Sequence, residues 1–205
     1  NTLSTIKSAA NGLSLDYEVL VFDDCSKDST VSLIRDFAAA NVDVSITLNV
    51  NKKTMGLGRN YVNGSYIAKY KYYMCIFGDY TAPVGTIRLI LENLGKADII
   101  IPYFNQKHRK MFRRLLSVTF TSLVNILSGN SIHYYNSTVV HLTNNVMRWH
   151  SDSQGFGFQA EMITRLIDVG STYIEVELKT YAEIDGESNA FNLRNIASVS
   201  HSLLQ

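Results

Sequence analysis

Two spacings of apolar residues alternate along the first half of the chain. Short apolar runs, each long enough for one strand, occur at residues 18–22, 44–50, 70–79 and 97–103. Apolar residues that recur three or four positions apart predict helices at residues 1–12, 28–41, 60–68 and 86–94. This alternation of strands and helices is typical of an α/β domain with a mostly parallel central sheet.

The second half of the chain changes character. Residues 109–129 predict one long helix, with an apolar stripe formed by Phe112, Leu116, Phe120, Leu123 and Leu127. A strand-like run, a glycine-led helix and an alternating strand are expected after it, at residues 132–142, 155–170 and 172–181.

Composition narrows the class of protein. The chain has 205 residues, of which 46% are hydrophobic, and this is sufficient for one domain with a sizeable core. A net charge of +1 argues against a nucleic-acid partner. The cysteines, Cys25 and Cys75, are far apart and suit a reducing compartment. Because a parallel sheet usually opens with a strand, we expect the first strand, ahead of the helix at residues 1–12, to be missing from this sequence.

Acidic residues follow the apolar strands. Asp23 and Asp24 end the run at 18–22, and Asp79 ends the run at 70–79. In open α/β sheets, ligands bind at the carboxyl ends of the strands, so these acids are candidate ligand contacts. Helix capping is an alternative explanation for Ser26, Asp28 and Ser29, but it explains the consecutive pair Asp23 and Asp24 less well.

The glycine turn MGLGRN, which contains Gly56 and Gly58, precedes a helix and would let the backbone approach a phosphate or sugar closely. Glycine pairs also occur in many ordinary turns. Asp79 is a candidate ligand for Mg²⁺ or Mn²⁺ beside a diphosphate, since magnesium often uses only one or two protein carboxylates. Its alternative role is that of a turn residue after Gly78.

A run of cations begins the long helix. It comprises Lys107, His108, Arg109, Lys110, Arg113 and Arg114. Cations at a helix N-terminus are opposed by the helix dipole, and an anion such as a phosphate would relieve this conflict. The alternative is that the cations face water while the apolar stripe packs on the core of the domain.

The motifs VLVFDDCSKDST, MGLGRN, IFGDYTAP, FRRLLS, GFGFQAEM and YIEVELKTYAEIDGES occur in this order over nearly the whole chain. Together they resemble the family 2 glycosyltransferases, and within them the branch that contains dolichyl-phosphate mannose synthase and polyprenyl-phosphate glucosyltransferases. The resemblance implies a Rossmann-like GT-A fold, a UDP- or GDP-hexose donor, a Mg²⁺ or Mn²⁺ cofactor and inversion at the sugar carbon. It also implies one catalytic domain over residues 1–205, with a donor-binding half at 1–104 and an acceptor-binding half at 105–205.

The resemblance assigns roles at the donor end. Asp24 matches the acid that contacts the base, Asp23 is its neighbour, and Gly56 and Gly58 match the family's glycine turn. Asp79 matches the second acid of the Asp-x-Asp metal motif and is therefore the expected metal ligand and a catalytic residue.

At the acceptor end, Arg113 matches an arginine four positions before a serine, here Ser117, that faces the acceptor phosphate. Arg113 is thus the second expected catalytic residue. Lys107 or Arg109 is expected to replace another arginine that is missing after the strand at 97–103.

Three further positions match the family, namely Glu161 of the glycine-led helix and Gly186 and Ser188 of a late Gly-x-Ser. The sequence departs from the family's pattern at Phe77, Glu183 and Asn189, where an acid, an arginine and a lysine are usual.

The sequence therefore predicts an inverting hexosyltransferase that uses polyprenyl or dolichyl phosphate as acceptor, in the cytoplasm and at the inner face of a membrane. A transferase acting on a hydroxyl of a surface glycan remains an alternative, as does an inactive nucleotide-sugar-binding module. Peripheral membrane contact and a homo-oligomer are compatible with the sequence.

Overall fold

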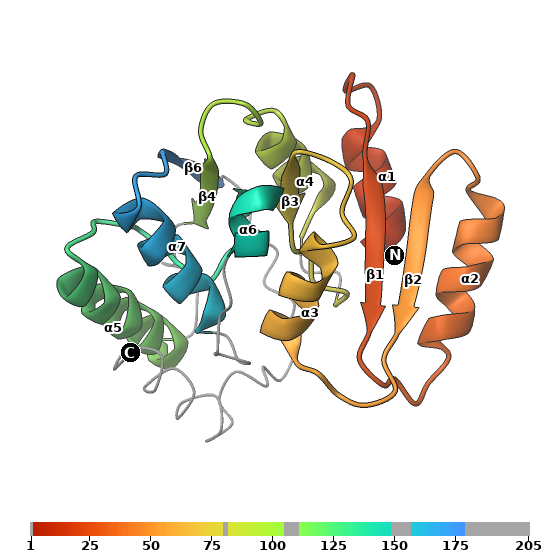
Figure 1. Cartoon of the computed structure of the whole chain (residues 1–205), viewed down its shortest axis with the longest axis horizontal. Coiled ribbons are helices and arrows are strands. Elements are labelled where there is room, and N and C mark those ends of the chain that lie inside the picture. Colours follow the sequence, from red (N-terminus) through yellow and green to blue (C-terminus); the bar gives the residue numbers. More distant parts are fainter. Residues whose placement is uncertain (1, 80–81, 105–110, 149–156, 179–205) are drawn as a thin grey trace.

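The structure, a computed structural model, describes residues 2–79, 82–104, 111–148 and 157–178. The helices are α1 (Thr2–Ala10), α2 (Thr30–Ala40), α3 (Leu57–Ser65), α4 (Val84–Leu91), α5 (Met111–Ser128), α6 (Thr143–Arg148) and α7 (Phe158–Asp168). The strands are β1 (Glu18–Asp23), β2 (Ser45–Val50), β3 (Tyr72–Met74), β4 (Ile99–Phe104), β5 (Val140–Leu142) and β6 (Tyr173–Leu178). Helices flank both sheets (Figure 1), which confirms the predicted α/β class.

Strands β1 and β2 form a parallel pair in register from Glu18 opposite Ser45 to Asp23 opposite Val50. Helix α2 connects them and lies beside β2 (Figure 1). Because both strands run in the same direction, their carboxyl ends meet, and the backbone N–H of Asn51 donates to the carbonyl of Asp23 at 2.9 Å. The predicted acids at the end of β1 therefore lie beside the residues that follow β2.

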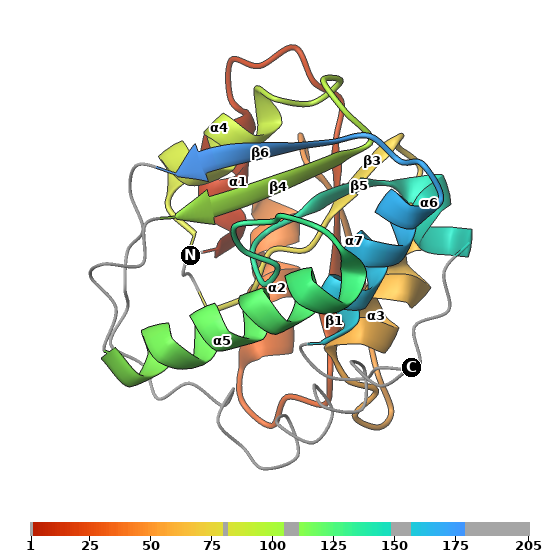
Figure 2. The same ribbon diagram turned by 90° about the vertical axis from the view of Figure 1, so that its left-hand side faces the viewer.

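The second sheet has the order β3-β5-β4-β6 (Figure 2). Strand β4 pairs parallel with β6, whereas β5 runs antiparallel to both β3 and β4. The side chains of β4 alternate between two hydrophobic clusters, with Ile99 and Ile101 in one and Ile100 and Phe104 in the other. This burial on both faces explains the continuous apolar run predicted for that strand.

Only the end of the predicted strand at 132–142 is extended, as β5. The preceding residues are irregular but include the buried residues Ile132 and Tyr135. The side chain of Asn125 donates to the carbonyl of Ile132 at 2.9 Å and accepts from its N–H at 3.1 Å. A side chain thus satisfies backbone groups that a neighbouring strand would otherwise pair.

Two helices, α3 and α6, differ from the prediction. Helix α3 ends at Ser65, earlier than predicted, and a Cβ atom at its Gly64 would overlap the hydroxyl of Tyr73. Glycine at this position therefore allows α3 to pack closely on β3. The short helix α6 follows β5 directly and was not predicted, because six residues carry little periodic signal.

His141 of β5 is 1% exposed and packs edge-on against Tyr61, at a ring-centroid distance of 6.3 Å. Neither of its ring nitrogens has a hydrogen-bond partner. Burial lowers the pKa of His141 to about 3. The unfolded chain, in which histidine has a pKa of about 6.5, therefore binds the proton more readily than the folded chain.

We expect acid to destabilise the fold through His141. The neutral, buried form of His141 contributes fully to stability above the unfolded pKa of about 6.5, and this contribution is lost as the pH falls toward the folded pKa. The free energy of unfolding should therefore fall by ~2 kcal/mol between pH 7 and pH 5. Urea titrations at both pH values measure this change. In His141→Leu, the difference in the free energy of unfolding between the two pH values should be smaller by ~2 kcal/mol. In His133→Leu, which alters an exposed side chain, this difference should persist. An unchanged pH response in His141→Leu would contradict the assignment.

Candidate functional site

The carboxylate of Asp24 holds the glycine turn that follows β2. Its Oδ1 accepts from the backbone N–H of Met55 at 2.8 Å, and its Oδ2 accepts from the N–H of Gly56 at 3.0 Å. Burial raises the pKa of Asp24, but hydrogen bonds from Met55, Gly56, Asn51 and the side chain of Asn60 outweigh it, so the net pKa is lowered. Asp24 is therefore ionised at neutral pH.

Asp23 and Cys25 flank Asp24 and differ from it in their surroundings. Asp23 is 4% exposed, and its Oδ2 accepts from the N–H of Ser26 at 3.2 Å, while its buried Oδ1 has no partner. Cys25 has a φ of 72°, a left-handed conformation that non-glycine residues seldom adopt. Such strain is found at functional sites more often than elsewhere. Its thiol donates to the carbonyl of Asn51 at 3.2 Å.

Asn51 and Asn60 join this arrangement, although the sequence reasoning did not single them out. The side-chain amide of Asn51 donates to Oδ1 of Asp24 and to Oδ1 of Asn60, both at 2.8 Å. Asn60 is buried in α3. The sequence does show that Asn51 directly follows a strand whose carboxyl end was expected near Asp24. Its hydrogen-bond partners, however, can be identified only once the fold is known.

The glycine turn has the conformation that its sequence suggests. Gly56 has a φ of 85°, which favours glycine, and it precedes α3 as its N-cap residue. Gly58 is buried in the first turn of the helix. The structure thus brings together Asp23, Asp24, Gly56 and Gly58, as predicted, in one layer at the carboxyl ends of β1 and β2.

Asp79 is exposed and lies in the segment between β3 and α4. The carbonyl of its neighbour Gly78 accepts from the hydroxyl of Thr2 at 3.0 Å, which places the start of α1 beside this segment. Among the described residues, no group of three or more His, Cys, Asp or Glu side chains could hold a metal ion. The described part of the chain therefore offers Asp79 as a single carboxylate, which a substrate diphosphate and water would complete, and this is an arrangement that Mg²⁺ accepts.

Helix α5 exposes most of its apolar side chains to solvent rather than packing them on the core. Its buried residues are Thr121 and Val124. The exposed apolar residues, which we term the α5 apolar surface, are Met111, Phe112, Leu115, Leu116, Val118, Leu123, Ile126 and Leu127. Phe112 is 67% exposed and Ile126 is 78% exposed. The alternative interpretation, in which this stripe packs on the core, fails for four of its five members, and of the stripe only Phe120 packs against the core.

Some of the polar residues of α5 lie on its more buried side. Arg113 and Ser117, four residues apart, are half-buried and lie in line with Thr121. The hydroxyl of Thr121 is buried and has no hydrogen-bond partner. Arg114 is exposed, as the solvated alternative predicted for the whole cation run. Lys107 and Arg109 lie outside the described residues.

Among the remaining matched positions, Glu161 is described. It lies in α7, where its carboxylate is 3.7 Å from the guanidinium of Arg165. Gly186, Ser188, Glu183 and Asn189 lie outside the described residues. No helix in the described part of the chain is both long and apolar enough to cross a membrane.

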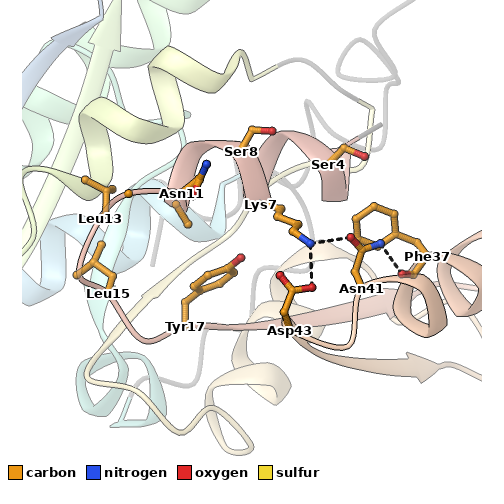
Figure 3. A pocket seen from close by; sticks show the side chains of 12 residues that line it. Ser4, Lys7, Ser8, Asn11, Leu13, Leu15, Tyr17, Phe37, Asn41 and Asp43 are labelled. Carbon is orange, nitrogen blue, oxygen red and sulfur yellow. Dashed lines mark hydrogen bonds and ion pairs between the residues drawn. The ribbon is translucent and has the colours of Figure 1, made fainter.

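A pocket of about 510 Å³ lies between α1 and the end of α2 (Figure 3). Its lining includes Tyr17, directly before β1, and Asp43, shortly before β2, so it is at the amino ends of these strands. Its cation, Lys7, is already bonded to Asn41 and Asp43 at 2.8 Å each. The pocket is therefore at the opposite end of the strands from Asp23 and Asp24 and offers no unpaired cation to a phosphate.

Comparison with known proteins identifies a family and several similar solved structures. The family model described as "Glycosyl transferase family 2" matches residues 1–152. Glucosyl-3-phosphoglycerate synthase from Mycobacterium tuberculosis in complex with UDP is similar in structure, with a TM-score of 0.67, 14% identity, and coverage of 98% of this chain and 76% of that one. The same enzyme with Mn²⁺, UDP and phosphoglyceric acid gives a TM-score of 0.68 at 14% identity, with 99% and 70% covered.

The complex of that enzyme with Mg²⁺ and UDP is also similar, with a TM-score of 0.63, 11% identity, and coverage of 98% and 71%. A search of curated proteins finds no match. At these identities the structural likeness establishes the fold, and it confirms the predicted α/β architecture of the GT-A type.

Proposed function

The chain belongs to glycosyl transferase family 2, and from this premise we propose that it transfers a hexosyl group from a nucleoside-diphosphate sugar to polyprenyl or dolichyl phosphate. We assign donor binding to residues 1–104 and acceptor binding to residues 105–205. The α5 apolar surface, together with the arginines at the start of the helix, is the observation that carries the choice of acceptor.

At the donor end, Asp23, Asp24 and the turn at Gly56 and Gly58 would form the wall of the nucleotide pocket. Asp79 would hold Mg²⁺ or Mn²⁺ beside the donor diphosphate. When bound, this ion would supply positive charge that stabilises the departing nucleoside diphosphate. The complexes of the similar synthase with Mn²⁺ or Mg²⁺ and UDP support this assignment by analogy.

At the acceptor end, Arg113 and Ser117 would bind the phosphate of the lipid. They lie on the half-buried side of α5, where Ser117 is one turn away from the buried, unpaired hydroxyl of Thr121, while the exposed side carries the α5 apolar surface. An anionic head group and a hydrocarbon chain would therefore meet surfaces of matching chemistry on one helix.

The reaction we propose is an in-line displacement with inversion. An oxygen of the acceptor phosphate forms a bond to the anomeric carbon while the bond from this carbon to the donor diphosphate breaks. The acceptor phosphate is already an anion, so no strong general base has to remove a proton from it. A hydroxyl acceptor would need such a base.

The same surface supports peripheral membrane contact. A helix with a broad apolar face and flanking cations can lie in the membrane interface, where its apolar side chains enter the acyl boundary. We propose that α5 does so at the inner, cytoplasmic face of a membrane that carries the polyprenyl phosphate.

A second candidate acceptor is a small phosphorylated molecule with a nucleophilic hydroxyl. The similar synthase is described with phosphoglyceric acid and glucosyl-3-phosphoglycerate, which favours a phosphate-bearing acceptor of either kind. Arg113 would then bind the same phosphate group, but the α5 apolar surface would have no part in the reaction.

We expect Arg113→Ala to raise the Michaelis constant for polyprenyl phosphate or to lower turnover by about tenfold or more, equal to ~1.4 kcal/mol, because a charge-assisted phosphate contact is lost. Steady-state kinetics with a polyprenyl phosphate in liposomes measures this effect. Arg114→Ala is the matched control, since Arg114 is the exposed neighbour.

Donor affinity should be nearly unchanged in both arginine variants. A double variant of the α5 apolar surface, Leu115→Ser with Ile126→Ser, should reduce liposome binding and leave donor affinity unaltered. Transfer to a water-soluble phosphorylated or glycan acceptor, with none to any polyprenyl phosphate, would show that the lipid assignment is wrong.

A further inference from the structure

The hydrogen bonds around Asp24 limit what this carboxylate can offer a ligand. A carboxylate has about four acceptor positions, two on each oxygen. Oδ1 already accepts from Asn51 and from the N–H of Met55, and Oδ2 accepts from the N–H of Gly56. The side chain of Asn60 is also near enough to lower the pKa of Asp24. At most one acceptor position therefore remains, and it is on Oδ2.

Nucleobases differ in the number of donors that they would present to such a group. Guanine carries two neighbouring N–H donors on one edge, and these match the two oxygens of an open carboxylate. Uracil and thymine present a single imide N–H between two carbonyls. A guanine at Asp24 would leave one buried donor unpaired, and an unpaired buried donor costs roughly 1–3 kcal/mol.

We propose that the donor nucleotide carries a base with a single imide N–H, namely a uridine or thymidine diphosphate, and that Asn51 enforces this choice. The proposal rests on the proposed function and decides between the two donor classes that the sequence left open. Asn51 is a positioning residue, because it acts on the ligand through Asp24.

The geometry of Asn51 explains how it acts. Its two amide hydrogens are divided between Asp24 and Asn60, and its backbone is tied to Asp23 and Cys25. Since alanine keeps the backbone N–H and carbonyl of residue 51, Asn51→Ala removes the restraint on Asp24 without removing the backbone bonds that hold the loop. The freed Oδ1 position would then accept a second donor, as guanine requires.

Calorimetry with UDP, dTDP, GDP and CDP in the presence of Mn²⁺ tests the proposal on the full chain. We expect UDP or dTDP to bind at least about tenfold more tightly than GDP, which corresponds to ~1.4 kcal/mol. In Asn51→Ala, the affinity for UDP should fall, and the preference for UDP over GDP should decrease several-fold. Comparison of UDP with dTDP separates the two imide bases.

Asn49→Ala is the matched control, because Asn49 lies two positions earlier in β2 and its side-chain amide nitrogen is buried without a partner. It should leave the UDP to GDP ratio unchanged, while a general loss of structure would weaken all nucleotides equally. GDP or CDP binding as tightly as UDP would overturn the proposal. If none of the four nucleotides binds to the folded wild-type chain, the proposed function itself fails.

Discussion

Asp79→Asn is expected to lower turnover by about 100- to 1,000-fold, equal to ~3–4 kcal/mol of transition-state stabilisation, because the proposed metal loses its protein carboxylate. The melting temperature should be almost unchanged, since Asp79 is exposed. Release of UDP or GDP in a coupled assay measures turnover. Chelator should abolish the activity of the wild-type chain, and added Mn²⁺ should restore it.

Asp36→Asn provides the control for the charge change, because Asp36 is an exposed acid of α2. It should retain wild-type turnover and metal dependence. Full wild-type activity in excess chelator would remove the metal from the proposed reaction, while the assignment to the glycosyltransferases would stand.

Asp24→Ala is expected to weaken donor binding by roughly 1–3 kcal/mol, the usual effect of losing a buried hydrogen bond to a charged group. The structure adds a second expectation, because this carboxylate also accepts from Met55, Gly56 and Asn51. The free energy of unfolding should therefore also fall, by ~1–3 kcal/mol. Nucleotide titration calorimetry and urea unfolding measure the two effects separately.

Asp28→Ala is the comparison for this prediction. Asp28 lies in the same loop but is exposed, and it accepts from the N–H of Thr30 at 3.0 Å. It should keep its donor affinity. Unchanged donor affinity in a folded Asp24→Ala variant would exclude Asp24 from the nucleotide site, and a loss of stability alone would show that it only holds the glycine turn.

Features that depend on local chemistry could be predicted from the order of residues alone. Apolar runs and helical spacing predicted the alternating elements, because each spacing matches the repeat of one kind of backbone. The acids Asp23 and Asp24 were placed correctly at the end of β1, and Gly56 was placed in a turn that requires its positive φ. Such features depend on residues that are close in the sequence, so they can be predicted without knowledge of the fold.

Features that depend on contacts between distant segments became visible only in the folded chain. The pattern of α5 showed that one side is apolar, but only the fold shows that this side is exposed and that Arg113 and Ser117 lie on the half-buried one. Likewise, Asn51 gains its role only when β2 ends beside β1. Periodicity states which residues share a face, whereas packing between distant segments determines what covers that face and which acceptors remain for a ligand.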